Sequence, residues 1–216
     1  MMRTNESGRS MIEMLGVLAI VGVLSVGGIA GYSKAMAKFK TNKVIDQINM
    51  MSTNIRTMYS SQRTYNGLNN VLAAKIGIAP AEMYNATSLT TLTGSSFALT
   101  NAFGGSVLVK SAITNAADDS YVIAMDEIPA SSCVTIVTTD WGNDSGSGLQ
   151  AIAVSADAEA ANTAINKANL TQSTNVAYQN TVAVVGVANS LLPFSLPNAT
   201  TACGTVGEVG IAWKYL

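Results

Sequence analysis

The chain of 216 residues contains no histidine, and only 12% of its residues are charged. Without histidine, the sequence excludes His-based catalytic triads, His general bases and His metal sites. Two cysteines alone cannot form a four-ligand zinc site, and no glycine-rich phosphate loop follows an expected strand. A formal net charge of −1 gives no positive field for nucleic acid. The sequence therefore shows no recognisable catalytic, cofactor, metal or nucleic-acid site, and none is expected.

The charges that are present divide unevenly along the chain. From Lys34 to Lys75 there are seven basic residues and one acid, whereas from Ile76 onward there are three basic and ten acidic residues. This asymmetry indicates either a self-complementary partner or two separately solvated faces. The hydrophobic share of 48% and the mean hydropathy of +0.29 exclude a disordered chain. The length suits one folded domain with an appendage.

Twenty uncharged residues, 14–33, lie between Glu13 and Lys34. A helix of about twenty apolar residues spans the hydrocarbon core of a bilayer, at about 30 Å. A secretory signal peptide is the alternative, but this run is long for one and a lysine-rich segment follows it. A carboxylate at the head of such a run costs about 2.5–3.5 kcal/mol in the membrane. Glu13 is therefore a candidate functional residue.

The apolar pattern then changes to a single helical stripe. Val44, Ile48, Met51, Ile55 and Met58 recur at spacings of four and three, with Ile45 and Tyr59 beside them. Because no proline precedes Pro80, we expect one helix from Ser10 to about Ser61. The stripe predicts burial against a globular domain, and a soluble coiled coil is the alternative.

The rest of the chain predicts short strands and helices. Strands are expected at 106–110, 121–125, 149–155 and 209–215, with a weaker one at 97–100, and the run 182–187 fits strand or helix. Helices are expected at 71–76, after Pro80, after Pro129 and at 158–169, with loop in the remainder of 156–180. This pattern predicts an α+β fold in which an antiparallel sheet packs on the long helix.

Cys133 and Cys203 are the two cysteines, and both follow the membrane segment. On the non-cytoplasmic side we expect them to form a disulfide, with two free buried thiols as the alternative. The segment from Asp140 to Gly146 is similar to part of a calcium loop, but Ala151 stands at its twelfth position. A polar turn is the preferred interpretation there, and a cation site is the alternative.

Residues 8–13 have the sequence Gly-Arg-Ser-Met-Ile-Glu and are followed by an apolar run. A glycine with a glutamate five residues later, at the head of such a run, resembles the processing site of type IV pilins and pseudopilins. The resemblance implies that a prepilin peptidase cuts after Gly8, so that Arg9 becomes the first mature residue and Glu13 the fifth. The family more often begins with Phe, Met or Leu, and usually methylates the new amine. It also implies that Glu13 pairs with the free amine of Arg9 in a neighbouring subunit during assembly.

A second set of residues resembles the type IVb pilins. These are Asn101–Val107, Ile128-Pro129 four residues before Cys133, and a late cysteine before a C-terminal strand. The leader of eight residues is shorter than is usual in that group. The resemblance implies a pilin-like α/β roll, with a disulfide that encloses a displayed C-terminal region. It divides the chain into a leader (1–8), a membrane or filament-core half-helix (9–33), an amphipathic half-helix (34–62) and a head (63–216).

The resemblance also implies a function, namely a major structural subunit of an extracellular type IV-like pilus. The expected partners are further copies of the chain in a helical homopolymer, the prepilin peptidase and the inner-membrane pilus assembly platform. The precursor is expected in the inner membrane and the product on the bacterial surface. Two alternatives remain open at this point. One is a pseudopilin or minor pilin of a type II secretion or competence system, and the other is a single-pass membrane-anchored binding protein that does not polymerise.

Overall fold

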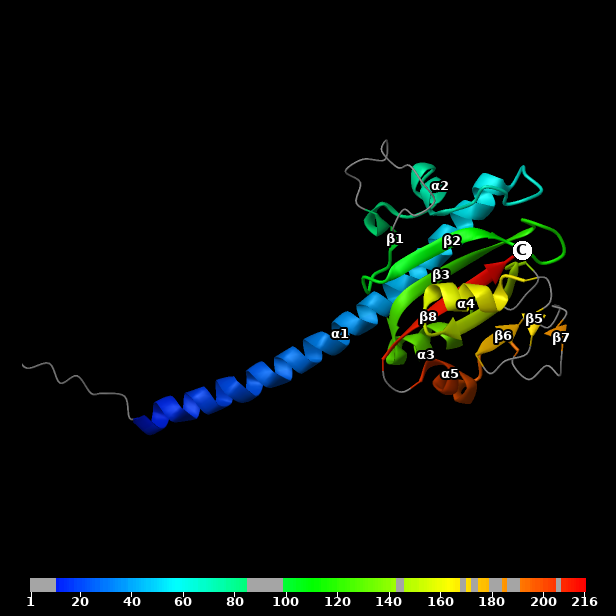
Figure 1. Cartoon of the computed structure of the whole chain (residues 1–216). Coiled ribbons are helices and arrows are strands. Elements are labelled where there is room, and N and C mark those ends of the chain that lie inside the picture. Colours follow the sequence, from blue (N-terminus) through cyan, green and yellow to red (C-terminus); the bar gives the residue numbers. More distant parts are fainter. Residues whose placement is uncertain are drawn as a thin grey trace, which may run out of the picture. The chain divides into compact units, whose positions relative to one another are not determined.

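The computed structural model describes residues 11–84, 99–142, 146–167, 170–171, 175–178, 184–185, 191–204 and 207–216. The chain divides into two compact units, Met1–Phe39 and Lys40–Leu216. One helix, α1 (Met11–Tyr59), contributes residues to both units (Figure 1). Its 49 residues confirm the continuous helix that the lack of proline predicts.

The second unit contains a six-stranded antiparallel sheet in the order β1-β2-β3-β8-β4-β6, with short helices around it. Its elements are α2 (Asn70–Lys75), η1 (Ala81–Met83), β1 (Leu99–Thr100), β2 (Ser106–Ala112), β3 (Ser120–Pro129), α3 (Ala130–Thr138), β4 (Leu149–Ser155), α4 (Ala158–Ile165), β6 (Val176–Tyr178), α5 (Leu196–Cys203) and β8 (Glu208–Tyr215). A separate parallel pair joins β5 (Leu170–Thr171) to β7 (Val184–Val185). The predicted α+β fold with an antiparallel sheet is confirmed.

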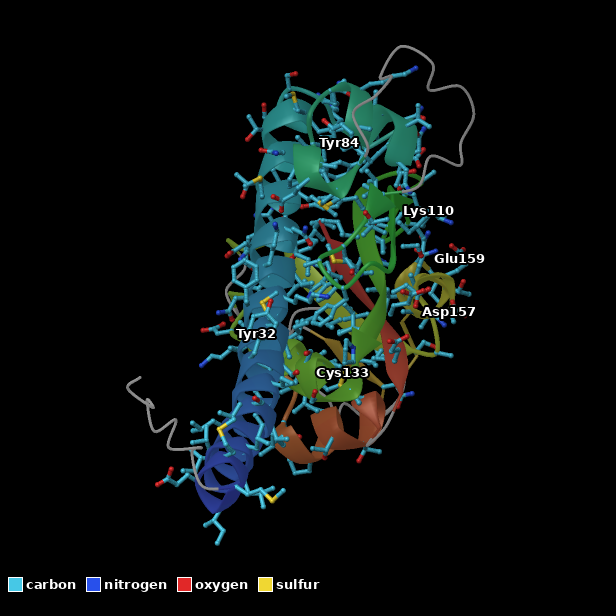
Figure 2. The ribbon with its side chains drawn as sticks, turned by 90° about the vertical axis from the view of Figure 1, so that its left-hand side faces the viewer. Tyr32, Tyr84, Lys110, Cys133, Asp157 and Glu159 are labelled. Atoms are coloured by element: carbon cyan, nitrogen blue, oxygen red, sulfur yellow. A yellow bond between two sulfur atoms is a disulfide. The ribbon has the colours of Figure 1, made fainter. Side chains whose placement is uncertain are left out.

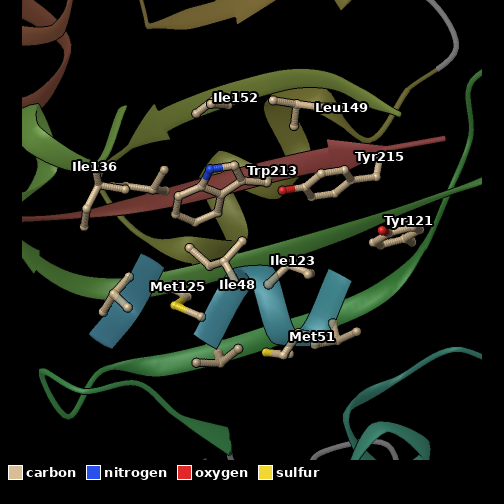
Figure 3. Packing of buried hydrophobic residues seen from close by; sticks show 14 of the residues in the cluster. Ile48, Met51, Tyr121, Ile123, Met125, Ile136, Leu149, Ile152, Trp213 and Tyr215 are labelled. Atoms are coloured by element: carbon tan, nitrogen blue, oxygen red, sulfur yellow. The ribbon is translucent and has the colours of Figure 1, made fainter. Parts of the chain in front are cut away.

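The two faces of the sheet carry side chains of different size. In the register, Trp213 of β8 lies opposite Ile123 of β3 and Ile152 of β4. These large side chains pack with α1 in the main core (Figure 3). One residue earlier, Ala212 lies opposite Ala124 and Ala153 on the face that α4 covers. This alternation of large and small residues allows a long helix on one face and a closely packed alanine-rich helix on the other.

Within the second unit, the predicted stripe of α1 faces this core. Val44, Ile48, Met51 and Ile55 are fully buried, as expected. The prediction for Met58 is wrong, because its side chain is 48% exposed and Tyr59 is buried in its place. The last two buried residues of the stripe, Ile55 and Tyr59, are therefore four positions apart. The ring of Tyr59 packs against the ring of Tyr65, with 5.3 Å between ring centroids, which favours its burial.

A cluster of tyrosines holds the end of α1 against the sheet. The Tyr121 ring lies 4.8 Å from Tyr65 and 5.2 Å from Tyr215, and the Arg56 guanidinium lies 5.4 Å from the Tyr215 ring. The Tyr121 and Ser52 hydroxyls form a buried hydrogen bond at 2.9 Å. Burial raises the pKa of Tyr121 to about 12 and also raises the pKa of Tyr215. Both phenols are therefore neutral in the folded protein at physiological pH.

Helix α4 lies on the opposite face of the sheet (Figure 1). Asp157 caps its N-terminus by accepting a hydrogen bond from Ala160 N at 2.7 Å. The helix starts directly above Gly210 of β8, where a Cβ would lie 2.0 Å from the carbonyl carbon of Asp157. The predicted helix at 158–169 is confirmed in its first eight residues. The expected loop after it is wrong in part, because β5 and β6 lie there.

A buried lysine lies on the same face of the sheet. Lys214 of β8 is 1% exposed, and its Nζ donates to the carbonyl oxygens of Ile113, at 2.6 Å, and Lys167, at 3.0 Å. Burial lowers the pKa of Lys214 to about 8, and the charge of Asp119 acts in the opposite direction. One ammonium group therefore links β8 to the segment after β2 and to the segment after α4.

The remaining elements agree with expectation except at one helix. The strands expected at 106–110, 121–125, 149–155 and 209–215 are all present, as are the helices after Pro80 and Pro129. Leu99–Thr100 confirms the end of the weak strand at 97–100, whose first two residues lie outside the described part. Val184–Val185 is a strand rather than a helix. Helix α5 (Leu196–Cys203) was not predicted.

Candidate functional site

The half of α1 in the first unit exposes an unusually large apolar surface. Each large apolar side chain from Met11 to Tyr32 is more than half exposed. By length and composition, α1 is the one helix among the described residues that could cross a membrane. Soluble monomers rarely expose continuous apolar patches above a few hundred Å². This surface therefore requires lipid or other helices as its surroundings.

The serines and glycines of this segment are compatible both with lipid and with packing against other helices. Ser25 Oγ donates to the Val21 carbonyl at 2.7 Å, and Ser33 Oγ donates to the Ile29 carbonyl at 3.0 Å. These bonds satisfy hydroxyls that would otherwise be unpaired in hydrocarbon. Apart from the neighbouring residues and the backbone of the helix itself, no described atom lies within 4 Å of where a Cβ would stand at the five glycines of the segment, Gly16, Gly22, Gly27, Gly28 and Gly31. Packing within the chain does not require these glycines, and their small size permits close approach of another helix.

Glu13 lies in the first turn of α1, where the helix dipole favours a negative charge. Within the described residues, no ion pair or hydrogen bond reaches its carboxylate. The predicted cleavage residues Gly8 and Arg9 lie outside the described part of the chain. The pairing of Glu13 with an Arg9 amine therefore stays a prediction.

Two of the lysines that follow the apolar segment, Lys40 and Lys43, have partners within the second unit. Lys43 Nζ lies 3.2 Å from Glu82 Oε2, and Gln47 Nε2 donates to Glu82 Oε1 at 3.3 Å. Lys40 Nζ lies 5.7 Å from the centroid of the Phe103 ring. In the described chain, no ion pair involves the exposed Lys34 or Lys38. These two lysines are therefore available to an acidic surface of another molecule.

One acid of the second unit, Asp119, has a local structural role. The Asp119 carboxylate accepts hydrogen bonds from the backbone N–H groups of Thr114, Asn115 and Ala116 at 2.6–2.8 Å. Desolvation raises the pKa of Asp119, but these donors outweigh it and lower the pKa below its ordinary value. Asp119 therefore stabilises the turn before β3 and is a weak candidate for contact with a neighbour.

The two cysteines form a disulfide between α3 and α5 (Figure 2). The Cα atoms of Cys133 and Cys203 are 5.8 Å apart, and both side chains are buried. Beside Cys133, the Ser132 hydroxyl accepts a buried hydrogen bond from Thr41 of α1 at 2.9 Å. The bridge thus closes a 70-residue separation and fixes α5 to a helix that is itself attached to α1.

The residues that resemble type IVb pilins form a tight turn. Asn101 Oδ1 accepts hydrogen bonds from the N–H groups of Phe103, Gly104 and Gly105, and its Nδ2 donates to Asp126 O at 2.7 Å. A Cβ at Gly105 would lie 2.1 Å from the same carbonyl oxygen. The motif therefore fixes the turn before β2 against the irregular part of β3.

The segment expected to form a turn or a cation site begins as a turn. Asp140 Oδ1 accepts a hydrogen bond from Gly142 N at 3.0 Å, and residues 143–145 lie outside the described part. In the ranges that the structure describes, no group of three or more Cys, Asp and Glu residues could hold a metal.

Three comparisons place these features among known proteins. The family model described as PilS N terminal matches residues 38–187. Two relatives are each named "Major structural subunit of bundle-forming pilus". The one from Escherichia coli O127:H6 (strain E2348/69 / EPEC) is 27% identical and the one from Escherichia coli O111:H- is 26% identical, each over 76% of this chain and 84% of the relative. The crystal structure of TcpA, a type IV pilin from Vibrio cholerae El Tor biotype, matches with a TM-score of 0.52 at 15% identity. That match covers 82% of this chain and 99% of TcpA.

Proposed function

This chain belongs to the PilS N-terminal family, and we propose that it is the structural subunit of an extracellular type IV-like pilus. One observation carries the proposal. A single helix presents more than half-exposed apolar side chains along one unit and buries a stripe of apolar side chains within the other. A helix of this kind supplies a hydrophobic surface for assembly and a rigid attachment for the head. The fold shared with a solved type IV pilin supports the same interpretation.

The subunit passes from lipid to protein surroundings during assembly. Before assembly, the segment 9–33 spans the inner membrane, behind a leader formed by residues 1–8. Prepilin peptidase removes the leader after Gly8, and the assembly platform moves the subunit into the filament. The head, residues 63–216, then lies on the outside, and the amphipathic segment 34–62 connects it to the core. The chain acts as a substrate of processing rather than as an enzyme.

Glu13 guides this transfer. An unpaired carboxylate in hydrocarbon costs about 2.5–3.5 kcal/mol. Pairing with the Arg9 amine of the preceding subunit removes this cost and also neutralises the amine. The charge pair therefore favours docking at the base of the filament and fixes the axial position of the incoming helix. The apolar helices supply most of the cohesion, because exposed ion pairs contribute only about 0–1 kcal/mol each.

Processing at Gly8 tests the proposal. Cells that produce Gly8→Val should retain the uncut precursor in the membrane and lose surface filaments, because the peptidase requires the small residue before the cut. Ser7→Val is the matched control and should leave both processing and filaments intact. Filaments are sheared from the cells, imaged by electron microscopy and identified by mass spectrometry. Normal filaments from Gly8→Val cells, or a mature chain that begins after Tyr32, would contradict the proposal.

A further inference from the structure

Strand β2 lies near one edge of the six-stranded sheet, and β1 covers only its beginning. The register pairs the two residues of β1 with Ser106 and Val107, and β2 continues to Ala112 with no further strand beside it among the residues that the structure describes. Outward-pointing backbone groups on such an edge can pair with a strand of another chain. Strand β2 has the sequence SVLVKSA, which contains no proline, so every residue keeps a backbone N–H group that could pair, and Lys110 is its one charged residue.

One side chain closes this edge. Asn70, the first residue of α2, is 9% exposed. Its Nδ2 donates to the Val107 carbonyl at 2.8 Å, and its Oδ1 accepts from the Val109 N–H at 2.7 Å. A primary amide that donates and accepts in this way imitates the backbone of a neighbouring strand. Two residues further along β2, the Ser111 N–H donates to the Leu68 carbonyl at 3.3 Å. The segment 68–70 therefore satisfies three outward backbone groups of β2.

We propose that Asn70 is an edge cap that prevents the β2 strands of two copies of this chain from pairing. The cap keeps an extended strand of another chain from pairing with β2. That strand is β2 of a second copy, which has the same exposed edge. A subunit that reaches a high local concentration exposes every open edge to its neighbours. The cap thus directs self-association away from the sheet, which leaves assembly to the helix. The inference concerns the head alone, so its failure would not affect the proposed function.

The neighbouring residue provides a matched control. Asn69 is the N-cap of α2, and its Oδ1 accepts from Leu72 N at 3.0 Å. Asn69→Ala therefore weakens the same helix and leaves the β2 edge closed, whereas Asn70→Ala opens the edge. The full-length protein in detergent micelles is examined by light scattering for protein mass per particle and by infrared spectroscopy for intermolecular strand pairing. We expect Asn70→Ala to at least double the protein mass per particle and to gain the intermolecular band. Wild type and Asn69→Ala should do neither.

A second variant separates strand pairing from simple unfolding. Because the Ser111 N–H points away from β3, Ser111→Pro removes an edge donor and blocks pairing without removing a bond between β2 and β3. In Asn70→Ala, adding Ser111→Pro should restore the particle mass of the wild type. If the double variant associates as much as Asn70→Ala, the association reflects unfolding and the edge-cap inference is wrong. It is equally wrong if Asn70→Ala stays the size of Asn69→Ala.

Discussion

Glu13 is the residue on which the proposed assembly depends most directly. Glu13→Val should insert into the membrane at least as well as the wild type, because it removes a carboxylate from hydrocarbon. Loss of one partner from a buried charge pair costs about 3–5 kcal/mol, so filament yield should fall by on the order of ten-fold or more. Fractionation measures insertion, and quantification of sheared filaments measures assembly. Ile12→Val, the control, should behave as wild type. Normal piliation of Glu13→Val would remove Glu13 from the mechanism.

Lys214 gives the head a distinctive dependence of stability on pH. Its pKa is about 8 in the folded protein and near 10.5 when unperturbed. Between these values the unfolded chain binds more protons than the folded chain, so the free energy of unfolding rises with pH across this window. The rise should be on the order of 1–3 kcal/mol, since burial is nearly complete but two carbonyls stabilise the ammonium. Above about pH 10 the buried tyrosines, whose pKa values are raised, should reverse the trend.

Denaturant unfolding of the wild type at several pH values between 7.5 and 9.5 checks this prediction. Lys214→Met should lack the rise between these values. Lys75→Met removes a positive charge from an exposed position and should keep the rise in the free energy of unfolding. A rise of equal size in Lys214→Met would show that another group is responsible.

The structural roles of some single residues could be predicted from the sequence, and those of others could not. The disulfide was predictable because the chain has only two cysteines and both follow the apolar segment, whereas the role expected of Glu13 stays a prediction. The roles of Asn70 and Lys214 were not predictable. Asn70 precedes β2 by more than thirty residues, and its two hydrogen bonds depend on how α2 meets the edge of the sheet. In the sequence, Lys214 is only a polar residue near the end of an expected strand. Its burial, which lowers its pKa, depends on the tertiary structure that brings Ile113 and Lys167 to its side chain.

At the scale of elements, the disulfide joins two short helices, α3 and α5, that also pack in the same core. Cys133→Ser should lower the free energy of unfolding by up to roughly 4 kcal/mol, the loop-entropy value for a bridge across 70 residues. Helix α5 should become sensitive to protease before α3, because Thr41 still holds α3 through Ser132. Chemical denaturation and limited proteolysis measure the two effects. The double variant Cys133→Ser/Cys203→Ser should be no less stable than the single one, and a further large loss would indicate that the thiols matter for packing instead.

The basic part of α1 leads to a second prediction at this scale. Lys34→Glu/Lys38→Glu should reduce filament yield, and the reduction should become smaller at high salt because exposed charges are screened. Head folding, followed by circular dichroism, should not change. Lys75→Glu on α2 is the control and should assemble normally. If the double variant assembles as well as the wild type at low salt, the uneven charge distribution does not contribute to assembly and serves only to solvate the surface.

Elements with strong periodicity were predictable, and elements without it were not. Helix α1 and strands β2, β3, β4 and β8 each carry a clear apolar pattern. Helix α5 is composed largely of Pro, Asn, Thr and Ala, so its sequence shows no apolar stripe. Its boundaries do carry a signal, because Pro197 lies in its first turn and Gly204 follows its last residue with φ of 70°. The short edge strand β6 depends on pairing with β4, which no local pattern reveals.

At the scale of the whole molecule, the two units have surfaces suited to different solvents. The unit Met1–Phe39 presents apolar side chains along its described helix, and the unit Lys40–Leu216 buries an extensive core. In water the first surface is unfavourable by about 25 cal/mol for each Å² of apolar area, and this free energy drives it into lipid or into contact with other helices. The proposed function supplies two such surroundings, a membrane before assembly and a filament after it.

The most direct test of the proposed function is a cryo-electron microscopy reconstruction of filaments sheared from the cell surface. The proposed function predicts that this chain is the repeating subunit and begins at Arg9. It also predicts that residues 9–33 form the helical core, and that Glu13 faces the amine of a neighbouring subunit. A filament built from another protein, or one in which the apolar half of α1 lies outside the core, would contradict it.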